Sequence, residues 1–145
     1  MSSPLVSICI PTYNREEYLK HALNSALEQT YSNIEILISD NDSNDNTVSL
    51  VESFNDKRIR LIVQKKNIGM VPNWNACIKH ARGKYIKFIA SDDLIDHDAV
   101  AKLVKPIHRD SSISLVTCKR RLIDENGKTI STLQYSNQNR KVNGM

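Results

Sequence analysis

The sequence predicts an α/β fold: an open, mostly parallel β-sheet flanked by helices on both faces. Short runs rich in Ile, Leu and Val alternate along the chain with longer segments in which apolar residues recur at helical spacing. Strands that alternate with helices in this way form parallel crossovers, whose handedness places helices on both sides of one sheet. The length of 145 residues suits a single domain over residues 1–145, since a domain near this length buries roughly two thirds of its unfolded surface.

Five runs have the composition of buried strands. Each is rich in aliphatic and β-branched residues and lacks an internal Gly or Pro. The runs are LVSICI at 5–10, IEILIS at 34–39, IRLIVQ at 59–64, YIKFIA at 85–90 and ISLVTC at 113–118. We expect all five to form strands.

Four segments have the apolar spacing of amphipathic helices. They cover residues 16–30, 48–54 and 72–81 and a segment that begins near His97. Pro106 is expected to kink or end the last helix, because proline lacks an N–H and clashes with the preceding turn. Further on, Asn126 and Gly127 have the composition of a tight hairpin turn.

Composition excludes several classes of function. The net charge of +4 is mild, and the basic clusters have little aromatic interleaving, so no nucleic acid partner is expected. Cys9, Cys77 and Cys118 are odd in number and lie far apart in apolar runs, which favours reduced core thiols over disulfides or a metal site. No apolar run reaches the ~20 residues of a membrane span, and the N-terminus lacks a leader pattern, so we expect a soluble, cytoplasmic protein.

Polar residues follow each of the first four predicted strands. They read PTYN, DNDSND, KKNIG and SDD in chain order. Because the carboxyl ends of parallel strands share one edge of a sheet, and ligands of open α/β sheets bind at that edge, this recurring polarity predicts a site there.

Asp92 and Asp93 are adjacent carboxylates directly after the fourth predicted strand. Two such charges about 4 Å apart repel by roughly 4 kcal/mol at an effective dielectric of 20, which favours a compensating cation. Oxygen ligands suit Mg²⁺ or Mn²⁺, which proteins commonly hold with one or two carboxylates together with phosphate oxygens. The alternative is that both residues lead into the next helix, where acidic side chains complement the helix dipole.

The segments after the first two strands carry groups that suit a nucleoside. Tyr13 could lie against a base, with Thr12 and Asn14 bonded to its edge or to ribose; alternatively, Thr12 or Asn14 caps the following helix and Tyr13 packs on the surface. Asp40 and Asn41 could bond a base edge. Their alternative is an Asn- and Asp-rich turn that caps a helix through Ser43 or Asp45.

Common nucleotide and hydrolase motifs are missing from the sequence. No GxGxxG follows the first strand, and there is no GxxxxGK[ST], which disfavours dinucleotide and P-loop sites. No serine lies in a GxSxG elbow, and the histidines have no metal-ligand spacing. A phosphoacceptor domain of flavodoxin-like topology is disfavoured as well, because acidic residues would be expected where PTYN stands.

Several spaced motifs carry a resemblance to one family. The stretches VSICIPTYNREEYLKHALNSALEQTYSNIEILISDNDSNDNT and NIGMVPNWNACIKHARGKYIKFIASDD resemble the nucleotide-sugar-binding half of family 2 glycosyltransferases with the GT-A fold. The match runs from about residue 5 to about residue 127. It includes the P-T-Y-N turn, QTY after the first helix, the acidic loop D-x-x-S-x-D-x-T and a D-x-D-like stretch.

The resemblance implies a role for each candidate site residue. Pro11, Thr12, Tyr13 and Asn14, with Asp40 and Asn41, would hold the base and ribose of a nucleoside diphosphate sugar, usually a uridine one. Asp92 would approach the ribose or the metal, and Asp93 would bind the divalent cation, Mn²⁺ or Mg²⁺, that bridges the diphosphate.

The resemblance also implies the reaction. Family members are metal-dependent, invert the anomeric centre and use a carboxylate base to activate a hydroxyl of a glycan or lipid-linked acceptor. That base is expected beyond Met145, so no catalytic residue is assigned within the sequence, and we expect this chain to transfer sugar poorly. Hydrophobic surface left uncovered would favour self-association, and a lipid-linked acceptor would bring the protein to the inner face of a membrane.

The sequence departs from the family pattern at three points. Asn41 stands where a second aspartate is frequent, and Ser91 replaces the first aspartate of D-x-D. PNWN, residues 72–75, lacks an arginine often found there. The alternative function is a nucleotide-binding or interaction module without catalysis.

Overall fold

A computed structural model describes residues 3–133 of the chain. The chain divides into two compact units, Met1–Ala101 and Lys102–Met145. The expectation of one domain over residues 1–145 includes 1–2 and 134–145, which lie outside the described residues, and it stays a prediction.

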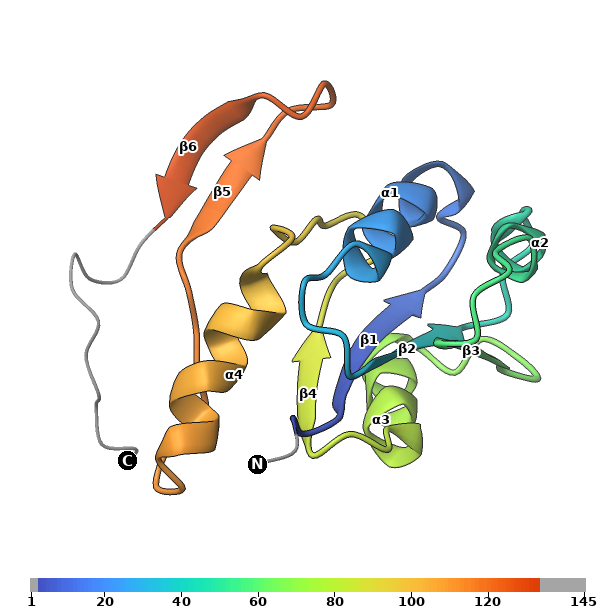
Figure 1. The fold of residues 1–145 in the computed structure, drawn as a ribbon. Coiled ribbons are helices and arrows are strands. Elements are labelled where there is room, and N and C mark those ends of the chain that lie inside the picture. The colour runs from blue at the N-terminus through green and yellow to red at the C-terminus, as the bar shows by residue number, and fades with distance from the viewer. Residues whose placement is uncertain (1–2, 134–145) are drawn as a thin grey trace. The chain divides into compact units, whose positions relative to one another are not determined.

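The first unit is built on a four-stranded parallel sheet. Its strands are β1 (Val6–Thr12), β2 (Ile34–Asp40), β3 (Ile59–Val63) and β4 (Tyr85–Phe88). Their order is β3-β2-β1-β4, and all three pairings are parallel (Figure 1). The first four predicted strands are thereby confirmed.

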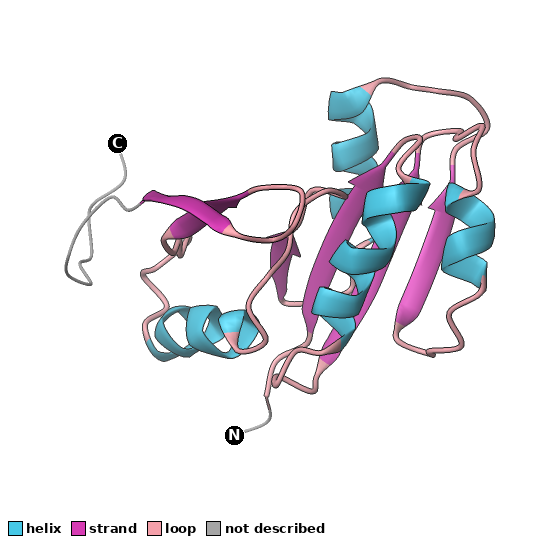
Figure 2. Cartoon of the chain, turned by 90° about the horizontal axis from the view of Figure 1, so that it is seen from above, coloured by secondary structure: helices cyan, strands magenta, loops and turns pink. Residues whose placement is uncertain are grey.

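Helices cover both faces of this sheet, which confirms the predicted fold class. The first three are α1 (Glu16–Leu27), α2 (Thr47–Glu52) and α3 (Met70–His80). α1 and α2 lie on one face and α3 on the other, as the view from above shows (Figure 2). The connecting helices therefore enclose β1 and β2 between two layers.

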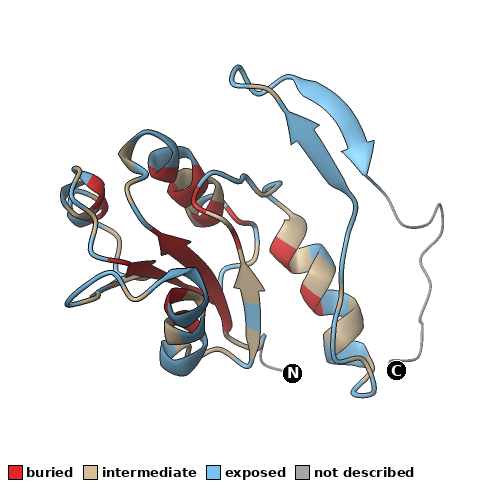
Figure 3. Cartoon of the chain, turned by 180° about the vertical axis from the view of Figure 1, so that it is seen from behind, coloured by how far each residue is buried: buried red, intermediate tan, exposed pale blue. Residues whose placement is uncertain are grey.

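The core is centred on β1 and β2, every residue of which is buried (Figure 3). Cys9 and Leu37 pack with Cys77 of α3 in one cluster. Because side chains alternate along a strand, Ile8 and Ile38 point to the opposite face, toward α1 and α2. Burial on both faces explains why these strands read as nearly continuous apolar runs.

The fourth helix, α4 (Ala99–Arg109), begins in the first unit and continues into the second. It runs past Pro106 to Arg109, so the proline does not end it. Pro106 removes one N–H donor, but its carbonyl still accepts a bond from the backbone N–H of Asp110 at 3.1 Å. None of the helices within residues 3–133 is long and apolar enough to cross a membrane.

The second unit contains an antiparallel hairpin of β5 (Arg120–Ile123) and β6 (Thr129–Leu133). The predicted turn is confirmed: Gly127 has a φ of 78°, and its N–H donates to the carbonyl of Asp124 at 3.0 Å.

The predicted strand at 113–118 is wrong. Residues 113–119 have no regular structure, and the next strand begins at Arg120. Leu115 is 81% exposed, and no strand among the described residues pairs with this run, so its apolar composition did not predict its structure. Cys118 is exposed in consequence, and only Cys9 and Cys77 are the core thiols that the sequence predicted.

Candidate functional site

The strand order of the sheet identifies where a ligand would bind. β1 pairs with β2 on one side and with β4 on the other, so the direction of the strand order reverses between β1 and β4. In open α/β sheets, ligands bind outside the carboxyl ends of strands at such a switch point. The segments after β1, β2 and β4 are the ones that the sequence predicted to carry the site.

β4 separates from β1 before β1 ends. The β1–β4 register stops at Cys9 and Phe88, whereas the β1–β2 register continues to Thr12 and Asp40. Pro11 lies in the part of β1 that no longer pairs with β4, where its missing N–H leaves no ladder bond unmade. The chain after β4 is thus free to turn away with Asp92 and Asp93.

Thr12 and Tyr13 offer polar and aromatic groups at the end of β1. Thr12 is 3% exposed, and its Oγ1 has no hydrogen-bond partner among the described residues. Buried hydroxyls nearly always have a partner, so the hydroxyl of Thr12 has bonding capacity that a ligand could use. Tyr13, by contrast, is 40% exposed and available for stacking.

Asn14 connects the β1–α1 turn with the β2–α2 loop. Its φ is 51°, its N–H donates to Ser43 Oγ at 2.9 Å, and its Oδ1 accepts from the N–H of Asn44 at 2.8 Å. α1 has no side-chain cap of its own, so the alternative that Thr12 or Asn14 caps it is wrong.

Asp45 and Thr47 supply the bonds that α1 lacks. Asp45 accepts from the N–H of Glu16 at 3.2 Å and from that of Thr47 at 3.0 Å, and Thr47 Oγ1 accepts from the N–H of Arg15 at 3.0 Å. Burial alone would raise the pKa of Asp45, but hydrogen bonds from Thr47 and Glu16 hold it below its ordinary value. The N-cap of α2 is Asn46, without a side-chain cap bond, so Asp45 acts from the residue before it through the N–H of Thr47.

Asp40 and Asn41 brace the loops on this edge of the sheet. Asp40 is fully buried, and its two carboxylate oxygens accept from the N–H and the hydroxyl of Ser43. The amide of Asn41 donates to Asn67 Oδ1 at 3.0 Å and accepts from the N–H of Ile68 at 2.9 Å. Both side chains thus bind protein groups that shape the site.

Asn73 is a buried polar residue that the sequence analysis missed. It is 3% exposed; its Nδ2 donates to the carbonyl of Ser39 at 2.8 Å, with a longer contact of 3.5 Å to that of Thr12, and its Oδ1 accepts from Ser39 Oγ at 2.7 Å. It thereby connects α3 with the carboxyl ends of β1 and β2. The available signal was a lone amide one turn before Cys77 on the buried stripe of α3.

Asp92 and Asp93 lie in a turn after β4 and are exposed. The backbone N–H of Asp93 bonds the carbonyl of Ala90 at 3.0 Å, while neither carboxylate bonds a protein group within residues 3–133. α4 begins only at Ala99 and has no acidic residue in its first turn, so the alternative that the pair complements a helix dipole is wrong.

The donor set suits a cation that is shared with a phosphate ligand. Within the described range, no group of three or more His, Cys, Asp or Glu side chains is placed to hold a metal. Two free carboxylates are nevertheless the usual protein contribution to Mg²⁺ or Mn²⁺ when diphosphate oxygens and water complete the shell. Asp92 and Asp93 fit that role.

A parallel sheet with helices on both faces and a polar switch point defines the class of nucleotide-binding α/β proteins. The chain belongs to glycosyltransferase family 2, whose model, "Glycosyl transferase family 2", matches residues 7–144. Among similar sequences, the chondroitin synthase of Escherichia coli is 38% identical over 130 residues, 88% of this chain and 19% of that protein. Another E. coli relative is UDP-Glc:alpha-D-GlcNAc-diphosphoundecaprenol beta-1,3-glucosyltransferase WfgD. It is 42% identical over 94 residues, 65% of this chain and 37% of that protein.

Solved structures agree with the family and show the GT-A fold. TarS of S. aureus in complex with UDP-GlcNAc matches with a TM-score of 0.68 and 29% identity. The match covers 72% of this chain and 31% of the TarS chain. The mannosyltransferase PcManGT of Pyrobaculum calidifontis, in complex with GDP-Man and Mn²⁺, matches with a TM-score of 0.67 and 27% identity. The match covers 73% of this chain and 33% of the PcManGT chain. The chain thus spans about a fifth to two fifths of the length of these relatives.

Proposed function

We propose that this chain provides the donor-binding site of a glycosyltransferase that uses a UDP-sugar together with a divalent cation. The observation that carries the proposal is that a buried hydroxyl without a described partner ends β1, and two carboxylates that bind no described protein group follow the neighbouring strand β4. The relatives support the donor class, because TarS was solved with UDP-GlcNAc and WfgD is named for a UDP-Glc substrate.

The residues after β1 and β2 would receive the nucleoside. The ring of Tyr13 is exposed for stacking on the base, and the hydroxyl of Thr12 is free to bond the base edge or the ribose. Pro11 directly precedes Thr12 and would fix the direction of the backbone where β1 ends. Asn14, Asp40 and Asn41 would act mainly by holding the surrounding loops, given the bonds that occupy their side chains.

The residues after β4 would receive the diphosphate. Asp93 would hold Mn²⁺ or Mg²⁺, and Asp92 would lie toward the ribose or the same cation. When bound, the cation neutralises charge on the departing nucleoside diphosphate. The protein's own contribution is to present two ionised oxygens without competing hydrogen bonds.

The reaction that follows is transfer of the sugar to an acceptor hydroxyl with inversion. It needs a carboxylate base on the acceptor side, and we assign none among residues 3–133. The names of the relatives favour a glycan or lipid-linked acceptor. We place the reaction in the cytoplasm, at the inner face of a membrane when the acceptor is lipid-linked.

Calorimetric titration with UDP, with and without Mn²⁺, tests the proposal. We expect Mn²⁺ to strengthen UDP binding by about tenfold or more in the wild type and to have little effect in Asp93→Asn. Glu52→Gln is the matched control, because Glu52 is an exposed acid on α2 away from the switch point.

Two results would count against the proposal. If UDP binding to the wild type does not respond to Mn²⁺, the proposed metal site is wrong. This result would favour a nucleotide-binding module without catalysis. If UDP does not bind under any condition, the proposed donor site is wrong.

A further inference from the structure

The loop that carries the acidic pair has no regular structure: residues 89–98 connect β4 with α4. The backbone of Asp93 bonds only locally, to the carbonyl of Ala90 at 3.0 Å, whereas Ile89 at the start of the loop bonds Cys9 of β1. Such a loop would sample many conformations unless another element held it.

Gln29, directly after α1, holds this loop. It is 7% exposed, and both ends of its carboxamide are used. Nε2 donates to the carbonyl of Asp96 at 2.9 Å and to that of Ser25 at 3.0 Å, while Oε1 accepts from the N–H of Val100 at 3.0 Å. The side chain therefore bridges the end of α1 and the start of α4.

Two neighbouring contacts extend the attachment on the same side. The N–H of Thr30 donates to the carbonyl of His97 at 2.8 Å, and Ser25 Oγ accepts from the N–H of Ile95 at 3.3 Å. With Gln29, these bonds fix four backbone groups between residues 95 and 100, all within the unit Met1–Ala101.

A carboxamide suits this position because it both accepts and donates. The N–H of Val100 belongs to the first turn of α4, where no intrahelical acceptor is available, and Oε1 supplies one. The carbonyl of Asp96 accepts from the N–H of Ala99 at 2.9 Å and receives a second bond from Nε2. Glutamate would accept from Val100 but, when ionised, would have no hydrogen for Asp96.

We propose that Gln29 is a positioning residue for the acidic pair. By holding residues 95–100 against the end of α1, it restricts where the chain runs after Asp92 and Asp93, and so presents both carboxylates to a cation and diphosphate at the switch point. The ligand part of this inference rests on the proposed function; the attachment of the loop does not.

The first test measures the loop without any ligand. In Gln29→Ala, backbone hydrogen exchange across residues 92–100 should be at least about tenfold faster than in the wild type, with β1 and β2 unchanged. Unchanged exchange in this segment would overturn the inference, whatever the protein binds.

The second test measures how far Mn²⁺ strengthens UDP binding. Gln29→Ala should reduce this gain by about tenfold, the usual effect of removing a group that orients metal ligands, while UDP binding without Mn²⁺ stays within about twofold. Gln29→Glu, which keeps the size and the acceptor, should lie between Gln29→Ala and the wild type. If Gln29→Ala is poorly folded, Gln29→Glu is the variant on which the Mn²⁺ gain is measured.

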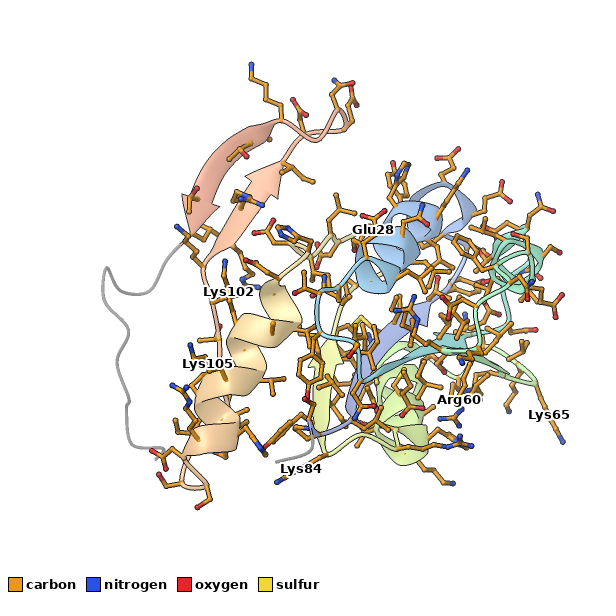
Figure 4. All side chains as sticks on the ribbon, viewed as in Figure 1. Glu28, Arg60, Lys65, Lys84, Lys102 and Lys105 are labelled. Carbon is orange, nitrogen blue, oxygen red and sulfur yellow. The ribbon has the colours of Figure 1, made fainter. Side chains whose placement is uncertain are left out.

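Two controls separate positioning from stability. Glu28, beside Gln29, is exposed and labelled in Figure 4; Glu28→Ala should match the wild type in both tests. Val51→Ala removes buried core volume on α2, so it should lower the unfolding temperature and leave the Mn²⁺ gain unchanged.

The outcomes distinguish the inference from the proposed function. A Gln29→Ala variant that loses stability but keeps the full Mn²⁺ gain would show a merely structural role and overturn the inference. A wild type without any Mn²⁺ gain would overturn the proposed metal site, and with it the ligand part of the inference, while hydrogen exchange would still decide whether Gln29 holds the loop.

Discussion

The hydroxyl of Thr12 is a residue-scale feature with two opposite effects. A buried hydroxyl without a partner destabilises the protein, yet it can bond a ligand. Thr12→Val should therefore leave the free energy of unfolding unchanged or raise it by up to about 1 kcal/mol, and should weaken UDP binding several-fold. Thermal unfolding and calorimetric titration measure the two effects.

Thr47 provides the matched control for Thr12. It is equally buried, but its hydroxyl accepts from the N–H of Arg15. Thr47→Val should lower the free energy of unfolding by about 1–3 kcal/mol, because it leaves that N–H unsatisfied. Equal stability losses in both variants would contradict the assignment of a free hydroxyl to Thr12.

Glu35 predicts a pH dependence of stability. It lies on β2 and accepts from Ser7 Oγ, the N–H of Arg82 and Arg60, each at 2.6 Å. Burial alone would raise the pKa of Glu35, but these bonds hold it below its ordinary value of 4.5. A depressed pKa in the folded state contributes stability above pH 4.5 that is lost as the pH falls through the folded value.

Glu35→Gln should remove that contribution. At pH 7 we expect a loss of about 2 kcal/mol in the free energy of unfolding, and a smaller difference from the wild type as the pH falls below 4.5. Urea unfolding at several pH values measures this difference, with the exposed Glu17→Gln as control. A difference that is constant with pH would count against the assigned hydrogen bonds.

At the residue scale, the sequence predicted which side chains lie at the candidate site better than it predicted their hydrogen-bond partners. Thr12, Tyr13, Asp92 and Asp93 lie at or after strand ends, as the sequence predicts, and each presents a group that binds no described protein group or is exposed. Asn41 also follows a strand, but its amide is bonded to Asn67 and Ile68. Such long-range partners depend on how loops meet in space, which local patterns do not specify.

Helix α3 contributes to the site through a single buried amide. Asn73→Ala should lower the free energy of unfolding by about 1–3 kcal/mol, because the hydroxyl and carbonyl of Ser39 lose buried partners. It should also weaken UDP binding, since β1 and β2 lose a connection at their carboxyl ends. The exposed Asn75→Ala on the same helix should change neither quantity, and equal effects of both variants would contradict this role.

The amino ends of β1 and β4 lie close together around Gly83. An added Cβ there would lie 2.5 Å from the backbone N of Ser7 and 2.9 Å from the carbonyl oxygen of Leu5. Gly83→Ala should lower the free energy of unfolding by about 1–3 kcal/mol, since backbone atoms cannot move aside easily. Urea unfolding measures the loss, and a neutral substitution would show that the loop before β4 can shift.

Elements with strong local signals were predicted well. The two fully buried strands, β1 and β2, and the Asn126-Gly127 turn each had a short-range pattern that fixed their type. The run at 113–118 had equal strand propensity, but it pairs with no strand within residues 3–133 and none of its side chains is fully buried. Amino-acid composition shows whether a segment can adopt an extended conformation. A β-strand also needs a neighbouring strand with which to form hydrogen bonds.

For the molecule as a whole, the sheet and every described candidate site residue belong to Met1–Ala101. β5 and β6 are exposed along their whole length, and the four strands of the parallel sheet all lie before residue 109. A chain of residues 1–109, which keeps α4 intact, should therefore unfold cooperatively and bind UDP as the longer chain does. Circular dichroism and calorimetry measure this, and loss of the cooperative transition would contradict it.

The alternation of strands and helices predicted the parallel sheet correctly, whereas the single domain over residues 1–145 stays a prediction. Parallel pairing with helices on both faces follows from crossovers that obey a general handedness rule, but this rule does not specify the strand order β3-β2-β1-β4. The division depends on how many contacts cross a boundary inside α4, at Ala101, and no linker composition marks it. A helix that continues through a boundary has no distinguishing sequence pattern.

The different environments of the three cysteines have a practical consequence for solution work. Cys9 and Cys77 are enclosed in the core, so Cys118 is the thiol that air or a maleimide reagent reaches. Two chains oxidised at this position would migrate as a covalent pair and imitate genuine self-association. Sedimentation should therefore be run with a reductant or with Cys118→Ser, and the same thiol offers a ready attachment point for a fluorophore.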